Sequence, residues 1–205
     1  MYKLPHFTEP DPSAVINFMK ENSFAVITGN GHDYPVATQI PLDILEIDGR
    51  LIFTGHIMKN TDHHKAFIED NHVLIVFNGP HCHVSASWYT NPHVASTWNY
   101  MTVHISGKIS FTDESGTRKI IQQITNKYEP TGSEAHFDRL PLDYVDRLIK
   151  AIVGFNIIAD SIENVFKLSQ NHELETRLSI IAHLKQRGDD QSNAIASEMQ
   201  KRINP

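Results

Sequence analysis

Apolar and polar residues alternate along most of the chain, in short runs that end at turn-forming residues. After Asp11-Pro12, apolar residues repeat at helical spacing, which predicts a helix over about residues 12–21. The β-branched and aromatic runs SFAVITG and YPVATQIPLDILEI predict extended chain. Asp48-Gly49 stands between ILEI and RLIFTGHI, and this residue pair favours a type I′ turn, so a tight antiparallel hairpin is expected there.

Strand-like and helix-like patterns continue to the end of the chain. KNTDHHKAFIEDN predicts a short helix, whereas VLIVF, HCHVSASW and TWNYMTVHISGKISFT predict strands. Spacings of three and four predict helices around residues 120–124 and 142–152, followed by a strand over roughly residues 153–168. Two helices are predicted at the end, one from His172 onwards and one near residues 192–203, with a break at Gly188.

Strands in succession, with helices that do not alternate regularly with them, favour a closed antiparallel sheet over a parallel α/β layer. The prediction is a mainly β protein, a small barrel of about six antiparallel strands with peripheral helices. No glycine fingerprint for a nucleotide and no internal repeat is present. We expect one barrel domain over residues 1–171 and a helical extension over residues 172–205, packed on the barrel or on a dimer partner.

Composition narrows the classes of function. The net charge is -6 at pH 7 among 205 residues, so the whole chain offers no electrostatic attraction for phosphodiester backbones. No apolar run approaches the length of a membrane span, and the start MYKLPHFTEPDP does not have the pattern of a secretory signal. Because Cys82 is the single cysteine, no disulfide can form within the chain, and a cytoplasmic location is expected.

Residues 79–107 form the stretch richest in candidate chemistry, GPHCHVSASWYTNPHVASTWNYMTVHISG. It holds both tryptophans, the cysteine and several of the 13 histidines. Such a density of aromatic and hydrogen-bonding side chains suits a flat heteroaromatic ligand. Strand alternation places His81 and His83 on one face and Cys82 and Val84 on the other.

This stretch resembles the PaiB family of FMN-binding negative transcriptional regulators, in which GPHxxVSxSWY is followed by TWNYxxVHxxG. MYxxxxF at the start, LIFTGHIMKN, IVGFNI and IENVFKLSQN are similar as well. The resemblance implies a flavoprotein with an FMN-binding split β-barrel of Greek-key-like topology. It also implies a homodimer with the flavin site at the subunit interface.

A polar cluster at the end of a predicted strand is the candidate site for the FMN phosphate. Its members are Thr54, Gly55, His56, Lys59, Asn60 and Thr61. Helix starts favour anions, and the resemblance assigns the phosphate to Lys59, with His56 as a weaker candidate. The family usually has arginine near Lys59. The alternative for this cluster is a solvated helix start with an exposed lysine.

Three further groups are candidates for the flavin ring and its edge: Trp88, Tyr89, Thr97, Trp98 and Asn99 from the aromatic stretch; Lys167 and Gln170 from KLSQN; and Thr38, Gln39 and Ile40 from YPVATQIPL. Indoles offer flat faces, and a side-chain amide can both donate and accept at a pyrimidine edge. The alternatives are tryptophans that pack in the core or in a dimer interface, and a surface turn at KLSQN.

Other functions receive less support from the residues. His63-His64 and His81-Cys82-His83 do not have the paired spacing of a closed zinc site, and Cys82 in a strand is typical of a small buried residue. The tail from His172 balances five Lys/Arg against five Asp/Glu residues, which is poor for DNA binding. A flavin-dependent sensor that regulates transcription, an FMN-dependent oxidoreductase or flavin reductase, and a haem-binding or haem-degrading split barrel remain as alternatives.

Overall fold

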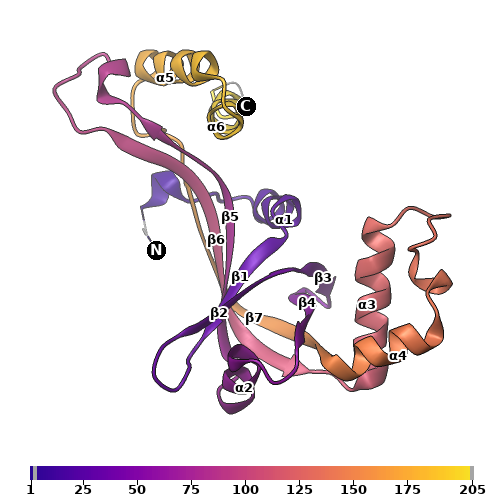
Figure 1. Cartoon of the computed structure of the whole chain (residues 1–205). Helices are drawn as coiled ribbons and strands as arrows, with labels where there is room; N and C mark the ends of the chain where they lie inside the picture. Colours follow the sequence, from indigo (N-terminus) through magenta and orange to yellow (C-terminus); the bar gives the residue numbers. More distant parts are fainter. Residues whose placement is uncertain (2–3, 204–205) are drawn as a thin grey trace. The chain divides into compact units, whose positions relative to one another are not determined.

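The structure, a computed structural model, describes residue 1 and residues 4–203, so Tyr2 of the MYxxxxF pattern lies outside the described residues. The described residues form seven strands and six α-helices, so helix and strand are about equally represented (Figure 1). The strands are β1 Phe24–Gly29, β2 Val36–Pro41, β3 Asp43–Ile47, β4 Arg50–Met58, β5 His72–Val84, β6 Thr97–Phe111 and β7 Ile152–Lys167. The helices are α1 Pro12–Glu21, α2 Asp62–Glu69, α3 Glu114–Tyr128, α4 Leu142–Ala151, α5 Leu174–Arg187 and α6 Asp190–Lys201, with 3-10 turns η1 Pro5–Phe7, η2 Ala86–Trp88 and η3 Phe137–Arg139.

The strands form one sheet in the order β2-β1-β5-β6-β7-β4-β3. The pairs β1/β2, β1/β5, β3/β4 and β4/β7 are antiparallel. β2 lies at one end of this order and β4 next to the other end, yet the two strands approach each other. The sheet is therefore curled into a split half-barrel, as predicted, with seven strands in the described residues where about six were expected.

Local signals in the sequence placed several elements correctly. α1 covers the predicted residues, and the Asp11 carboxylate accepts a hydrogen bond from the Ser13 backbone N–H at 2.9 Å. In the β3–β4 hairpin, Asp48 and Gly49 have φ angles of 50° and 72°. Two successive positive φ angles define the type I′ turn, whose twist matches that of the flanking strands.

Three predicted strands were wrong in extent. YPVATQIPLDILEI is divided by the buried Leu42 into β2 and β3. VLIVF and HCHV instead form a single strand, β5, which continues through Gly79. Glycine at this position makes room for the Phe18 ring, since a Cβ there would lie 2.4 Å from it. SASW is not extended: the Ser85 hydroxyl accepts a hydrogen bond from the Ser87 N–H and caps a 3-10 turn. A side chain that caps a turn offers the backbone an alternative to the sheet ladder.

By internal contacts the chain divides into two compact units, each formed by separate stretches of sequence. Unit 1 comprises residues 1–18, 78–103 and 163–205, and unit 2 comprises residues 19–77 and 104–162. Each of β5, β6 and β7 contributes to both units. The predicted domain boundary after residue 171 stays a prediction.

Unit 2 has an apolar core between its strands. The rings of Phe53 and Phe77 are fully buried and 5.7 Å apart, and Phe155 lies on the β7 segment of the same core. A second apolar cluster lies under α3 and α4, where Val145 and Ile149 pack with Phe137. Large buried aromatic rings such as these supply much of the driving force for folding.

Unit 1 is held together by the two C-terminal helices. α5 ends at Gly188, whose φ of 77° is the left-handed conformation that glycine adopts without strain. Ile180, Leu184 and Ile195 are fully buried, and the Phe166 ring lies 5.0 Å from that of Phe18. The two helices are therefore part of a packed core.

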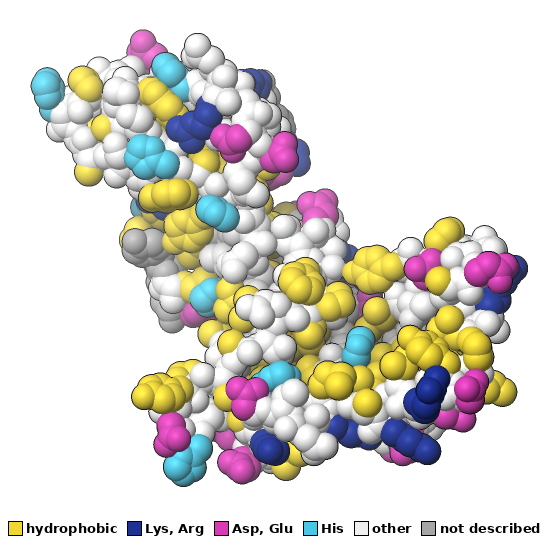
Figure 2. Space-filling view, viewed as in Figure 1, with side chains coloured by type: hydrophobic (Ala, Val, Ile, Leu, Met, Phe, Trp, Pro, Cys, Tyr) yellow, Lys and Arg dark blue, Asp and Glu magenta, His cyan; other side chains and the backbone are white. Residues whose placement is uncertain are grey.

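On the face shown in Figure 2, Lys and Arg side chains lie among Asp and Glu side chains and form no continuous basic surface. Among the described residues, no helix is both long enough and apolar enough to cross a membrane.

Candidate functional site

The β4 strand carries two polar side chains at alternate positions, the buried Thr54 and the half-buried His56. Thr54 is 3% exposed, and neither its hydroxyl oxygen nor Nδ1 of His56 has a hydrogen-bond partner among the described residues. Alternate residues of a strand point to the same face. Burial lowers the pKa of His56, so its imidazole is neutral near pH 7. Buried polar groups are almost always paired, so this pair of atoms is where a ligand would supply the missing partners.

The turn after β4 brings three predicted phosphate ligands to the start of α2. The Lys59 ammonium donates to the Ile149 carbonyl oxygen at 3.4 Å. Asn60 has a φ of 65°, and its backbone N–H donates to Nδ1 of His64 at 3.1 Å. The hydroxyl of Thr61 caps α2 by accepting from the His64 N–H at 3.3 Å. A cation, hydroxyl groups and a helix start therefore come together at one strand end.

Charge at this helix start is mixed. The exposed Asp62 accepts a hydrogen bond from the backbone N–H of His63 at 2.8 Å, and that bond lowers the pKa of the carboxyl. Burial, together with the positive charges of His63, Lys59 and Lys65, lowers the pKa of His64. His64 therefore acts as a neutral acceptor for Asn60, and Lys59 is the permanent cation beside the strand end. An ammonium with neutral donors is the chemistry that a phosphate requires.

The predicted residues on β2 belong to the same unit as this strand end. Thr38, Gln39 and Ile40 pair with Ile27, Val26 and Ala25 of β1. α2 packs on β1 and β2, and β2 approaches β4. The curl of the sheet thus brings the β2 candidates and the β4–α2 candidates into one neighbourhood, although they are distant in the strand order.

Gly55, predicted with the phosphate group, has a packing role. A Cβ at this position would lie 2.8 Å from the Phe155 ring and 3.1 Å from the Leu42 side chain. Glycine allows β4 to lie close to this core, which holds Thr54 and His56 on the opposite face of the strand.

The remaining candidates belong to unit 1. Trp88, at the end of η2, stacks on the His183 ring at 5.1 Å and lies 4.7 Å from the Arg187 guanidinium. Its carbonyl oxygen accepts a hydrogen bond from the Ser179 hydroxyl at 2.7 Å. Trp88 therefore anchors α5 through both its ring and its backbone. These contacts do not test the predicted role of Trp88 at the flavin, which stays a prediction.

Trp98 and Asn99 are neighbours on β6 with opposite environments. Trp98 is 54% exposed, and its ring lies 6.3 Å from that of His81 and 6.0 Å from that of His83. Asn99 has no exposed surface, and its side-chain oxygen accepts a hydrogen bond from the Ser169 hydroxyl at 3.0 Å. The predicted alternation is confirmed here, since exposed His81 and His83 flank buried Cys82.

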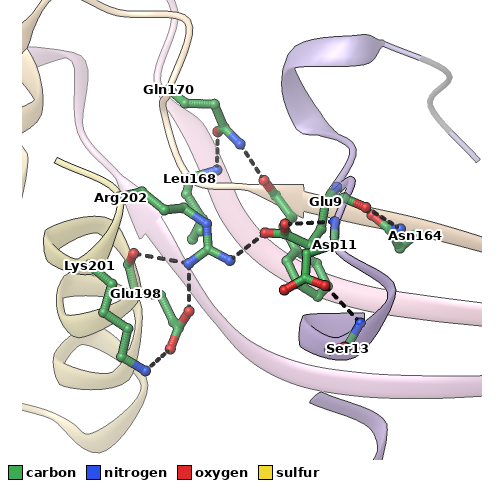
Figure 3. Close-up of polar contacts among 10 residues, drawn as sticks. Glu9, Asp11, Ser13, Asn164, Leu168, Gln170, Glu198, Lys201 and Arg202 are labelled. Atoms are coloured by element: carbon green, nitrogen blue, oxygen red, sulfur yellow. Dashed lines mark hydrogen bonds and ion pairs between the residues drawn. The ribbon is translucent and has the colours of Figure 1, made fainter. Parts of the chain in front are cut away.

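The KLSQN candidates have local partners (Figure 3). Gln170 accepts a hydrogen bond from the Leu168 N–H and donates one to the Phe166 carbonyl oxygen, both at 2.6 Å, so it caps the end of β7. The Lys167 ammonium donates to the Thr97 hydroxyl. The sequence shows that these side chains are polar but does not show their partners. The partners of Gln170 depend on how β7 ends, and the partner of Lys167 lies on a second strand.

Tyr89, a candidate for the flavin ring, lies beside His172, which was not among the predicted ligands. Tyr89 is 8% exposed, its hydroxyl has no partner among the described residues, and its ring lies 4.8 Å from that of His172. The sequence contains no signal for this pairing, because the two residues come from separate segments. Among the described residues, no group of three His, Cys, Asp or Glu side chains is placed to hold a metal ion.

Comparisons with known proteins agree on fold and family. The model of the family described as "Putative FMN-binding domain" matches residues 1–161. The chain is 29% identical over 204 residues to "Protease synthase and sporulation protein PAI 2" of Bacillus subtilis, covering 99% of this chain and 98% of that protein.

Two solved structures are similar in fold. One is a FAD and heme binding protein from Mycobacterium smegmatis, with a TM-score of 0.58 and 13% identity over 78% of this chain and 73% of the other. A second is described as a putative 5-nitroimidazole antibiotic resistance protein from Bacteroides thetaiotaomicron, with a TM-score of 0.56 and 14% identity over 77% of this chain and 84% of the other.

Proposed function

The chain belongs to the family described as "Putative FMN-binding domain", and we propose that it binds FMN, with the phosphate at the β4–α2 junction and the ring edge along β2. One observation carries the proposal: Thr54 and His56 hold buried polar atoms that have no partner in the described part of the chain, and both residues lie shortly before Lys59. FMN requires cations or donors for its phosphate and polar partners for its pyrimidine edge, and this junction supplies both. When bound, the flavin supplies redox chemistry that side chains alone do not provide.

A titration of the purified full-length chain with FMN tests the proposal. At an FMN concentration of about 100 Kd, binding to the folded state alone stabilises it by about 2.7 kcal/mol. For a chain of this size that corresponds to an increase in Tm of roughly 5–11 °C. Quenching of flavin fluorescence gives Kd in the same preparation. Neither a spectral shift nor thermal stabilisation by FMN would refute the proposal.

Comparison of FMN with riboflavin, which lacks the phosphate, tests the role of the β4–α2 junction. Replacement of Lys59 by Met removes the cation and retains most of the side-chain volume. We expect this variant to lose about tenfold or more in FMN affinity, because a hydrogen bond to a charged group contributes about 1.5–3 kcal/mol. Its riboflavin affinity should stay unchanged. Lys108→Met, at an exposed position on β6, is the matched control. Equal loss of both ligands would place the phosphate elsewhere.

A regulatory role is the second part of the proposal. We propose a homodimer, with the flavin site at the subunit interface, that acts as a flavin-dependent sensor and negative regulator of transcription. The resemblance to PaiB proteins and the full-length similarity to PAI 2 support it. The exposed Trp98 suits an interface, because large aromatic side chains are enriched there. Light scattering would measure the subunit count.

Contacts of the C-terminal helices bear on how such a regulator would act. Arg202 pairs with Glu198 and Glu9, and Lys201 pairs with Glu198. Arg187 donates to the His83 carbonyl oxygen. Arg187 and Arg202 are engaged within unit 1, so direct phosphate contacts from these two side chains are disfavoured. Retardation of a promoter fragment at low salt, with and without FMN, would test DNA binding.

Turnover of NAD(P)H by the FMN-loaded chain would favour the oxidoreductase alternative, and a Soret band would favour the haem alternative.

A further inference from the structure

Unit 1 contains a cavity of about 240 Å³. It is lined by Tyr89, by the segment before β6, by the end of β7 and by the turn that leads into α5. Pockets that hold drug-sized ligands and cofactors have volumes of about 300–1,000 Å³. This cavity therefore suits a ligand of only a few heavy atoms.

Tyr89 lines the cavity and carries an unused donor. The residue is more than nine-tenths buried, and its hydroxyl has no hydrogen-bond partner among the described residues. Burial raises the pKa of this phenol, so it remains a neutral donor. A buried hydroxyl without a partner destabilises the fold, and an acceptor in the cavity would remove that cost.

Lys167 supplies the positive charge of the cavity. Its ammonium donates to the neutral Thr97 hydroxyl and lies 5.9 Å from the centre of the Phe7 ring. In the described part of the chain, no carboxylate forms an ion pair with it. The neighbouring His172 is neutral near pH 7, because burial and the charge on Lys167 lower its pKa. The cavity therefore holds one cation, one neutral phenol donor and no anion.

We propose that this cavity binds a small monocarboxylic acid, with its carboxylate between the Lys167 ammonium and the Tyr89 hydroxyl and its hydrocarbon part against Val94 and Ala95. One cation balances one negative charge, whereas a phosphate dianion would leave excess charge in a partly buried site. The proposal goes beyond flavin binding. Lys167 and Thr97 are candidates for the flavin site in the sequence. In this proposal they bind a carboxylate instead.

Calorimetric titration of the full-length chain, without FMN and at constant ionic strength, tests the proposal. The probes are acetate, butyrate and benzoate, with butanol as the uncharged analogue and inorganic phosphate as the competing anion. We expect saturable binding of butyrate and benzoate, tighter than that of acetate, and none of butanol. Absence of saturable carboxylate binding, or tighter binding of phosphate than of butyrate, would overturn the proposal.

Two variants assign the binding to the cavity. Tyr89→Phe removes only the hydroxyl, and Lys167→Gln removes the charge. Each should weaken butyrate binding about ten- to hundredfold, because each removes a hydrogen bond to a charged group. Tyr128→Phe and Lys108→Gln make the same chemical changes at exposed positions outside unit 1 and should bind butyrate as the unmodified chain does. Unchanged affinity in both cavity variants would refute the assignment.

Stability measurements show whether a variant loses butyrate binding because it misfolds. FMN measurements show whether the cavity proposal and the flavin proposal succeed or fail independently. Without ligand, Tyr89→Phe should be at least as stable as the unmodified chain, since it removes a buried hydroxyl that lacks a partner. Butyrate binding by a chain that binds no FMN would support the cavity while the flavin proposal fails. Competition between FMN and butyrate, together with weaker FMN binding by Lys167→Gln, would assign the cavity to the flavin and overturn the proposal.

Discussion

Replacement of Arg202 by Met should destabilise the chain by removing a set of ionic contacts that joins Glu9, in the segment before α1, to α6 (Figure 3). The guanidinium donates to Glu198 at 2.6 Å and to Glu9 at 3.0 Å, and it lies 5.6 Å from the centre of the Phe166 ring. The Glu9 backbone is held in turn, because its N–H donates to the Asn164 side chain at 2.8 Å. One guanidinium thus links Glu9, in the segment before α1, to α6.

The magnitude follows from the partial exposure of these groups. The Arg202 and Glu9 side chains are 25% and 16% exposed, so each ion pair should contribute more than the 0–1 kcal/mol or so of a surface pair. Hydrogen bonds to charged groups contribute about 1.5–3 kcal/mol, and discounting for solvent gives about 2–3 kcal/mol for the whole substitution. In a chain of this size, that lowers Tm by roughly 4–12 °C.

Urea denaturation of the single and double variants of Glu9 and Arg202 measures the coupling between them. We expect Glu9→Gln and Arg202→Met to be non-additive by about 1 kcal/mol, as is usual for residues in contact. Lys201→Gln is the control, because the Lys201 side chain is 70% exposed and the substitution should change stability by about 0.5 kcal/mol or less. Additive effects, or an Arg202→Met cost no larger than that of Lys201→Gln, would refute the reasoning.

Two further predictions concern titrating groups. Burial raises the pKa of the Cys82 thiol to about 11, so the folded chain should react with a thiol-specific disulfide reagent at pH 7.5 only as fast as it unfolds. Denatured chain should react at once, and rapid labelling of folded chain would contradict the burial of this thiol. Hydrogen bonds from Asn30 and His72 lower the pKa of Asp70 from 3.8 to about 2, so its contribution to stability is present above about pH 4 and is lost as the pH falls towards 2. Asp70→Asn should therefore flatten acid denaturation between pH 4 and 2, and an unchanged profile by circular dichroism would exclude this linkage.

Much of the fold could be predicted because its signals are local. The Asp48-Gly49 turn follows from backbone conformations that few residue pairs adopt, and α1 follows from a cap and a helical repeat. The prediction failed at SASW, where a serine cap outweighed the strand pattern, and at Gly79, where the glycine marks the close approach of Phe18 and not the end of a strand. These outcomes depend on one hydrogen bond and one distant ring.

The candidate flavin site was predictable in part. Lys59, Asn60 and Thr61 follow one another in the chain, so their meeting at a helix start was readable from the sequence together with the family resemblance. The sequence does not show that Thr54 and His56 lack hydrogen-bond partners in the described structure. Whether a polar atom has a partner depends on all the residues that pack around it, and these come from distant parts of the chain.

The sequence by itself determined where most strands lie, the Asp48-Gly49 turn and the family, since these depend on backbone sterics, side-chain periodicity and motifs within short segments. The tertiary structure decided which polar groups are paired. Gln170 caps its own strand, Trp88 anchors α5, and Tyr89 and Lys167 line the same cavity. Burial and hydrogen-bond satisfaction arise from residues far apart in the chain, so they exist only once the chain has folded.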